Sequence, residues 1–211
     1  MNNNPEGAIL SSAYFPPIEY FRVIARVGNI FIEKHETYQK QTYRNRCKIL
    51  AGDGPLSLSI PLIKGDDRTI TSMEIDYSKP WLQQHKRGLV SAYNSSPFFE
   101  YYQDDIFKVL DARHKTLFDL NIALTELMLN LLGIRATILP TPEYIKEYPA
   151  EIIDFRESIH PKKESLHPLT LPKAGKGEYY QVFIEKFGFT PNLSALDLLF
   201  NEGPDSTSYL L

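Results

Sequence analysis

The spacing of apolar positions in the first 33 residues predicts a strand, a helix and a second strand. Residues 8–13 form an apolar run of strand length, residues 18–27 place apolar side chains at helical spacing, and residues 30–33 form another short apolar run. This order is typical of α/β folds with parallel strands, whose ligands bind beyond the carboxyl ends of the strands. Residues 14–17, which follow the first strand, are therefore expected near a binding site.

The next part of the chain predicts a β-hairpin or a meander. Residues 53–55 read Asp-Gly-Pro and are typical of a turn, and residues 56–62 alternate between apolar and polar as a half-buried strand does. Residues 70–75 are expected to form another strand. These strands and the first two predict a mixed sheet.

Three helices are expected in the middle of the chain. Ser78 is the expected cap of the first, and Ser96 followed by Pro97 is the favoured order at the start of the second. Thr116 with Asp119 three residues later resembles a capping box at the start of the third. The expected helices span residues 81–93, about 97–111 and 117–132.

The last third of the chain predicts less regular structure. Residues 135–139 are expected to return as a strand, whereas residues 155–177 are rich in Pro, Lys and His and predict an irregular basic loop. Residues 178–187 match an amphipathic helix, and Asn192 or Ser194 is expected to cap a final helix. We therefore expect one α/β domain with an N-terminal β-α-β unit, a mixed sheet, three central helices and a C-terminal helical segment.

Composition narrows the classes of function. The 211 residues are 43% hydrophobic and carry a net charge of -3, with a sequence pI near 6.0, which argues against general nucleic-acid binding. One cysteine excludes an intramolecular disulfide and fits a reducing compartment. The N-terminus lacks the features of a signal peptide, and no segment reaches membrane-spanning length. A cytoplasmic protein with no metal and no cofactor is expected.

Residues 37–48, the basic segment, carry four fixed positive charges and no acid. If the segment is extended, Lys40, Arg44, Arg46 and Lys48 share one face, opposite Asn45 and Cys47. Arginine forks favour bidentate carboxylate or phosphate partners, so the segment predicts a site for a small anion such as a sugar phosphate or a nucleotide sugar. The alternative is an exposed edge strand, because lysine and arginine also protect sheet edges from pairing.

Common catalytic signatures are absent from the sequence, including the phosphate loop, the dinucleotide glycine fingerprint and the nucleophile elbow. His85 follows Trp81 by four residues, so it lies on the apolar stripe of its helix as either a general base or a core histidine. Cys47 follows two arginines that would favour a thiolate, but alternation makes a small buried hydrophobe the better interpretation.

Two further features leave alternatives open. The helix that follows Asn192 can bind an anion at its N-terminus, although simple capping is preferred. The irregular loop carries His160, Lys162 and Lys163, which can close over an anionic ligand as a lid or can form a surface segment.

Several separated motifs, in this order, resemble the WbqC-like family of bacterial proteins over nearly the whole chain. They are Ser-Ala-Tyr-Phe-Pro-Pro-Ile-Glu-Tyr-Phe at 12–21, Tyr-Gln-Lys-Gln-Thr-Tyr-Arg-Asn-Arg at 38–46, Trp81 with His85, Ser-Ala-Tyr at 91–93 before Ser-Pro-Phe-Phe at 96–99, and Asn-Leu-Ser-Ala-Leu-Asp-Leu-Leu-Phe-Asn at 192–201 before Gly203-Pro204. The match covers Tyr14, Pro16 and Tyr20 in the first motif, and Lys40, Arg44, Asn45 and Arg46 in the second. The chain differs from longer members by a shortened segment before the final helix.

The resemblance implies a role in cell-surface polysaccharide biosynthesis, including the O-antigen of lipopolysaccharide, where some members are described as amino-acyl (glycine) transferases acting on amino sugars. We expect a group transferase with His85 as base and with Asn45 and Tyr14 as further catalytic residues. The expected ligand-binding residues are Lys40, Arg44, Arg46, Tyr20, Tyr93 and Asn192. The alternative is a non-catalytic binding or scaffolding component of a glycan-assembly pathway.

Overall fold

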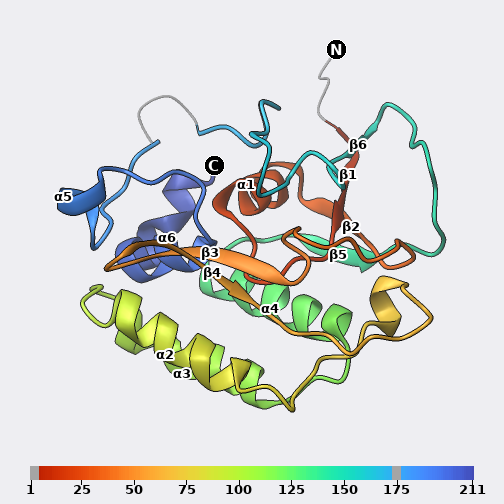
Figure 1. Ribbon diagram of the computed structural model, residues 1–211. Helices are drawn as coiled ribbons and strands as arrows, with labels where there is room; N and C mark the ends of the chain where they lie inside the picture. The colour runs from red at the N-terminus through yellow and green to blue at the C-terminus, as the bar shows by residue number, and fades with distance from the viewer. Residues whose placement is uncertain (1–4, 173–176) are drawn as a thin grey trace.

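Four parallel strands form the main sheet in the computed structural model, which describes residues 5–172 and 177–211 (Figure 1). The strands are β1 (Gly7–Ser11), β2 (Asn29–Glu33), β5 (Thr137–Pro140) and β6 (Ile152–Asp154). They lie in the order β5-β2-β1-β6, and each neighbouring pair is parallel. This confirms the predicted parallel pair and the predicted strand near residues 135–139, whereas β6 was not predicted.

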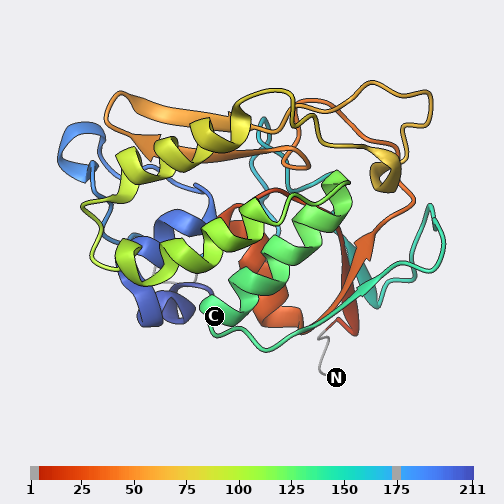
Figure 2. The same ribbon diagram turned by 90° about the horizontal axis from the view of Figure 1, so that it is seen from below.

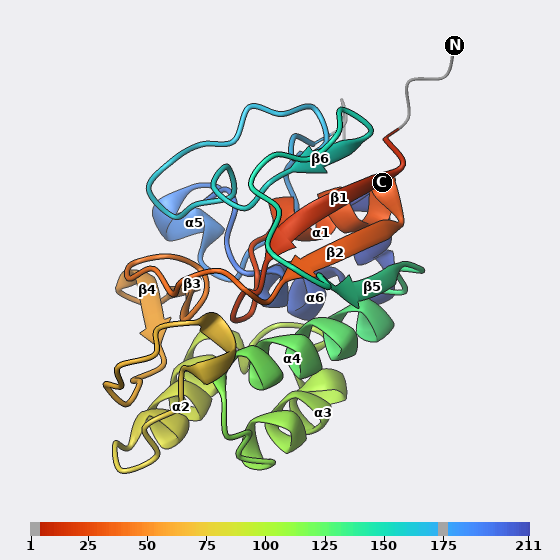
Figure 3. The same cartoon turned by 90° about the vertical axis from the view of Figure 1, so that its right-hand side faces the viewer.

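Helix α1 (Ile18–Val27) joins the two strands of the N-terminal unit and packs on them. It begins after Pro17 and ends at Gly28, whose φ of 81° lets its N–H reach the Ile24 carbonyl at 3.0 Å. Helix α6 (Ala195–Glu202) packs on α1, and Ser194 caps it as predicted by accepting from the Leu196 N–H at 3.3 Å. Figure 3 shows α1 behind the sheet, which leaves the carboxyl edge open for other segments.

Strands β3 (Arg46–Ala51) and β4 (Gly54–Ser59) form an antiparallel hairpin apart from the main sheet. The sequence predicts one mixed sheet. In the structure the parallel pairs and the antiparallel pair belong to two separate sheets. Residues 40–45 fold as turns and bends before β3 begins, so the predicted alternation along the whole basic segment is wrong. The four cations of that segment do not share one face.

The three central helices lie alongside one another and carry the hairpin on one side (Figure 2). They are α2 (Trp81–Tyr93), α3 (Phe99–Asp111) and α4 (Leu117–Leu131). Thr116 caps α4 as predicted, because its Oγ1 accepts from the Asp119 N–H at 3.2 Å. The predicted caps Ser78 and Ser96 are wrong, because Pro80 and Phe98 occupy those cap positions and the Ser78 hydroxyl donates to Asp76 instead.

Two predicted elements are replaced by a turn and a loop, which hydrogen bonds from side chains stabilise. Residues 70–75 form a short 3-10 turn, Ile70–Ser72, because the Asp67 carboxylate accepts from both the Thr69 N–H and the Ser72 hydroxyl. Only α5 (Ile184–Phe187) forms within residues 178–187, because the Gln181 amide exchanges two hydrogen bonds with the Thr190 backbone and holds a loop.

The remaining features concern the ends and the surface of the fold. A 3-10 helix, η2 (Gly203–Tyr209), follows α6. The irregular loop at 155–177 contains turns and bends in its described part, and its residues 173–176, like the first four residues of the N-terminus, lie outside the described residues. Within the described ranges, no helix combines the length and the apolar character needed to cross a membrane.

Candidate functional site

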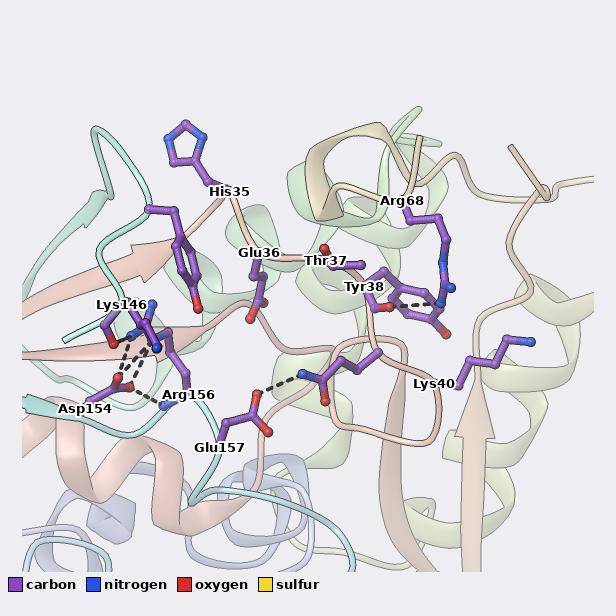
Figure 4. A pocket seen from close by; sticks show the side chains of 12 residues that line it. His35, Glu36, Thr37, Tyr38, Lys40, Arg68, Lys146, Asp154, Arg156 and Glu157 are labelled. Carbon is purple, nitrogen blue, oxygen red and sulfur yellow. Dashed lines mark hydrogen bonds and ion pairs between the residues drawn. The ribbon is translucent and has the colours of Figure 1, made fainter. Parts of the chain in front are cut away.

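A polar pocket of about 960 Å³ lies at the carboxyl edge of the main sheet, where the segments that follow β2, β5 and β6 meet (Figure 4). Ligands of open α/β sheets bind at this edge, beside the position where the strand order reverses. Here β1 has β2 on one side and β6 on the other, so the pocket lies at such a position. We call it the carboxyl-edge pocket, and its lining is His35, Glu36, Thr37, Tyr38, Gln39, Lys40, Arg68, Tyr144, Lys146, Asp154, Arg156 and Glu157.

Arg156 organises the β6 side of the carboxyl-edge pocket. Its Nε and Nη2 donate to the Asp154 carboxylate at 3.0 and 2.6 Å, and its Nη1 donates to Glu33 Oε2 at 3.0 Å. Glu33 is fully buried at the end of β2, and its other oxygen accepts from the Thr141 hydroxyl and the His35 N–H at 2.8 and 2.9 Å. One guanidinium therefore ties the ends of β2 and β6 together across β1.

Arg44 forms the second buried ion pair, below the middle of the carboxyl-edge pocket. Its Nε donates to Glu36 Oε1 at 2.8 Å, and its Nη2 contacts Glu36 Oε2 and donates to Ser11 Oγ at 2.8 Å. Burial raises the pKa of Glu36, while its bonds to Arg44 and Ser11 act in the opposite direction. Because Arg44 is only 3% exposed, its charge is used within the protein and not presented to a ligand.

The rim of the carboxyl-edge pocket carries charges that remain free. In the part of the chain that the structure describes, the Nζ atoms of Lys40 and Lys146 have no hydrogen-bond or ion-pair partner, and Arg68 bonds only the Tyr38 carbonyl, at 3.4 Å. The Glu157 carboxylate is 59% exposed and accepts from Gln39 Nε2 at 2.9 Å.

Figure 4 shows the Glu36 and Glu157 carboxylates directed toward each other. Glu157 Oε1 also lies 3.6 Å from Arg44 Nη2. Three cations without a carboxylate partner among the described residues therefore lie at this rim, together with the exposed Glu157, and the rim favours an anion that also carries hydrogen-bonding groups.

A second cavity of about 500 Å³ adjoins the first beside the β3–β4 hairpin. The two cavities share Tyr38, Lys40 and Arg68. We call the second one the hairpin pocket, and its lining is Tyr38, Lys40, Gln41, Asn45, Arg46, Ile60, Pro61, Leu62, Ile63, Lys64, Gly65, Arg68 and Met73.

The basic segment contributes to both pockets, although not as a single cationic face. Lys40 lines both pockets, and Asn45 and Arg46 line the hairpin pocket. Asn45 Nδ2 donates to the Ile60 carbonyl at 2.9 Å, which fastens the start of β3 to the segment after β4. From the irregular loop, Lys162 contacts the side chain of Gln41 and so lies at the margin of the hairpin pocket.

Three aromatic or imidazole side chains predicted for the site lie in the core and line neither pocket. The Tyr14 hydroxyl contacts His85 Nδ1 at 2.9 Å, and the Trp81 ring packs edge-on against His85. Burial lowers the pKa of His85 to about 4, although a bond with the Ser59 backbone raises it. Tyr93 is buried against Phe200. His85 is thus placed as a neutral core histidine, and the geometry gives a base at this position no support.

The remaining candidates are also set apart from the two pockets. Tyr20 is buried and donates its hydroxyl to the Ser11 carbonyl at 3.0 Å. Asn192 lines a separate cavity of about 140 Å³, where its Oδ1 accepts from the Glu19 N–H at 3.2 Å. Cys47 is 1% exposed and burial raises the pKa of its thiol, which matches the interpretation as a small buried hydrophobe.

Sequence reasoning missed most of the acidic and basic residues of the carboxyl-edge pocket. Asp154 ends β6, and Arg156 and Glu157 follow it; this strand of three residues is too short to show a periodic pattern. The expectation of a site beyond the strand ends points to the edge at which this pocket lies, but residues 14–17, which it named, are buried and line neither pocket. Recognition of β6 is what would have pointed to the residues of the pocket.

Comparison with known proteins agrees with the motif resemblance. The sequence profile of the WbqC-like protein family matches residues 11–168. The "Uncharacterized protein Rv1507c" of Mycobacterium tuberculosis (strain ATCC 25618 / H37Rv) is 27% identical over 227 residues, which cover 96% of each chain. No solved structure matches the chain. The family match spans both pockets and more than half of the sequence, so the chain belongs to the WbqC-like protein family.

Proposed function

We propose that this protein is a group transferase of cell-surface polysaccharide biosynthesis that binds a phosphorylated amino sugar in the carboxyl-edge pocket. The observation that carries the proposal is the division of charge there. The buried acids Glu33 and Glu36 are bound by arginines, whereas Lys40, Arg68 and Lys146 at the rim have no carboxylate partner among the described residues. A phosphate satisfies such cations, and the family resemblance supplies the pathway.

The polar groups of the pocket suit a sugar. Gln39 and the exposed carboxylate of Glu157 offer hydrogen bonds to hydroxyl and amino groups, and the half-exposed Tyr144 ring, which lies over the Arg156 guanidinium at 5.1 Å, offers an apolar surface to a sugar face. Catalysis in such a site is mainly positioning and electrostatic stabilisation.

Glu157 is the group that we assign as proton acceptor in place of His85, because its carboxylate is 59% exposed, whereas the carboxylate of Asp154 in the same pocket is bound by Arg156. In transfer of an acyl group such as glycyl, which the resemblance implies, the sugar amine attacks the acyl carbon and forms the new C–N bond. The amine proton passes to Glu157, and the leaving group departs from the acyl carbon with the electron pair of the broken bond.

Thermal unfolding with glucosamine 1-phosphate, glucose 1-phosphate and free glucosamine tests binding, because a ligand of the folded state raises Tm. We expect glucosamine 1-phosphate to stabilise the protein, Lys146→Ala to reduce the stabilisation, and Lys108→Ala, at an exposed lysine of α3, to retain it. Glu157→Gln is expected to keep binding and lose transfer from a glycyl thioester, followed by mass spectrometry. Stabilisation by neither sugar phosphate would refute the proposal, and binding without transfer in the unsubstituted protein would favour a non-catalytic binding component.

A further inference from the structure

The hairpin pocket differs from the carboxyl-edge pocket in its charge. Lys40, Arg46, Lys64 and Arg68 line it, and no acidic residue does. In the described ranges, no carboxylate forms an ion pair with any of these four cations. Four unpaired cations around 500 Å³ are more than a single carboxylate ligand requires, and they fit a group with two phosphates.

The walls of the hairpin pocket are apolar. Ile60 and Met73 are buried behind it, and Leu62 and Ile63 border it, with Ile63 49% exposed. Tyr38 and the Arg68 guanidinium lie together at its junction with the carboxyl-edge pocket, as Figure 4 shows. A flat ring can pack against these apolar side chains while its phosphates remain on the cations.

Two buried polar atoms of the lining, Asn45 Oδ1 and Arg46 Nε, have no hydrogen-bond partner among the described residues. Asn45 is 9% exposed, and its Nδ2 is occupied by the Ile60 carbonyl, whereas its Oδ1 is buried and has no hydrogen-bond partner in the described part of the chain. A buried amide oxygen without a partner costs free energy unless a ligand supplies an N–H. Bases that carry a ring N–H or an exocyclic amino group offer this donor, and an isoprenyl chain does not.

We propose that the hairpin pocket binds a nucleoside diphosphate, so that the substrate of the protein is a nucleotide-linked sugar. The base lies against Ile60, Ile63 and Met73. The diphosphate lies among the four cations, with Lys40 and Arg68, which line both pockets, on the side of the carboxyl-edge pocket. This arrangement directs the attached sugar into the carboxyl-edge pocket. The inference rests on the proposed function for the sugar, but the nucleotide is bound by different residues.

Calorimetric titration with free nucleoside diphosphates tests this inference without any transfer reaction. The panel contains uridine, thymidine, cytidine, guanosine and adenosine diphosphates, with inorganic diphosphate and geranyl diphosphate for comparison. We expect at least one nucleoside diphosphate to bind about tenfold more tightly than both comparison compounds, a difference that corresponds to one or two additional favourable contacts from the base.

Substitutions then locate the site. Arg46→Ala and Lys64→Ala are each expected to weaken nucleoside diphosphate binding by about tenfold, as expected for loss of a charge-assisted contact. Ile63→Asp, at a half-exposed position, is expected to weaken the binding of the nucleotide and to leave the binding of inorganic diphosphate unchanged. Arg87→Ala and Lys108→Ala remove exposed cations of α2 and α3 that line neither pocket, and these controls are expected to bind normally.

Each result decides a separate point. Equal binding of inorganic diphosphate and all nucleotides would overturn the inference, because the apolar wall would contribute nothing. Tighter binding of geranyl diphosphate than of every nucleotide would overturn it in favour of a lipid phosphate. Nucleotide binding together with no response to glucosamine 1-phosphate would support the hairpin pocket and refute the proposed sugar site.

Discussion

Arg44 and Arg46 are two residues apart, but their guanidinium groups have opposite surroundings. Arg44 is 3% exposed and paired with the buried Glu36, whereas Arg46 is half-buried, lines the hairpin pocket and has no ion-pair partner among the described residues. Arg44→Ala leaves Glu36 buried and uncompensated, and we expect it to lower the free energy of unfolding by about 3–5 kcal/mol. Arg46→Ala is expected to cost less than about 1 kcal/mol.

Urea unfolding of the two variants checks this difference, and similar small losses in both would contradict it. The sequence shows both charges, but it does not show that a turn through residues 40–45 carries Arg44 back to Glu36. For this reason Arg44→Ala is not a clean test of ligand binding, and Arg46→Ala is.

His85 makes stability depend on pH. Its pKa is about 4 in the folded protein, because of burial, and 6.5 in the absence of shifts. Between these two pH values the unfolded chain binds a proton at His85 that the folded protein does not bind. The contribution of His85 to the free energy of unfolding is therefore complete above pH 6.5 and is lost as pH falls to about 4. The loss amounts to about 3 kcal/mol across the window.

Comparison with His85→Gln isolates this effect from the other groups that titrate in the same range, which include Glu19 and Asp197. The difference in free energy of unfolding between the unsubstituted protein and the variant is expected to shrink as pH falls from 6.5 to 4. A difference that stays constant in urea titrations across this range would show that His85 is not a buried neutral ring.

At the scale of elements, two residues that the sequence predicts as helix caps differ in the structure. Thr116 accepts from the Asp119 N–H at the start of α4, whereas the Ser78 hydroxyl donates to the exposed Asp76 and caps no helix. We expect Thr116→Ala to lower the free energy of unfolding by about 1 kcal/mol and Ser78→Ala to change it by less than about 0.5 kcal/mol. Chemical denaturation measures both, and equal effects would contradict the assignment of the cap.

Elements with a repeated apolar pattern could be predicted, and elements held by single side chains could not. The helix spacing at 81–93 is found without change in α2, and the apolar run at 8–13 overlaps β1. Residues 70–75 carry a strand-like pattern, but the Asp67 carboxylate holds a turn there. Residues 178–187 have helical periodicity, but the Gln181 amide binds the Thr190 backbone. Such side-chain bonds to the backbone and to nearby hydroxyls override helix and strand preference and leave no periodic signal.

At the scale of the whole molecule, the site depends on strand order. The carboxyl-edge pocket brings residues 35–40 together with residues 144–157, because β1 lies between β2 and β6 in the sheet. The sequence predicts the β-α-β unit and the edge at which ligands bind, but it does not place β6 beside β1. The acids and cations that matter most in this pocket are therefore found only when the sheet is assembled.

The two pockets and their junction predict a pattern of affinities that single-site binding would not give. Lys146 lines only the carboxyl-edge pocket, Lys64 lines only the hairpin pocket, and Lys40 lines both. Lys146→Ala is expected to weaken the binding of glucosamine 1-phosphate by about tenfold and to leave the binding of nucleoside diphosphates unchanged. Lys64→Ala is expected to have the opposite effects, because each variant loses one charge-assisted contact.

Lys40→Ala is expected to weaken the binding of both ligands. It is also expected to make both affinities depend less on the concentration of sodium chloride, because a cation at a pocket rim attracts anions over distances at which salt screens charge. Calorimetry of the three variants at low and at physiological ionic strength measures the pattern. If Lys40→Ala affected only one ligand, the pockets would act as separate sites, and a sugar nucleotide that spans the junction would no longer account for their arrangement.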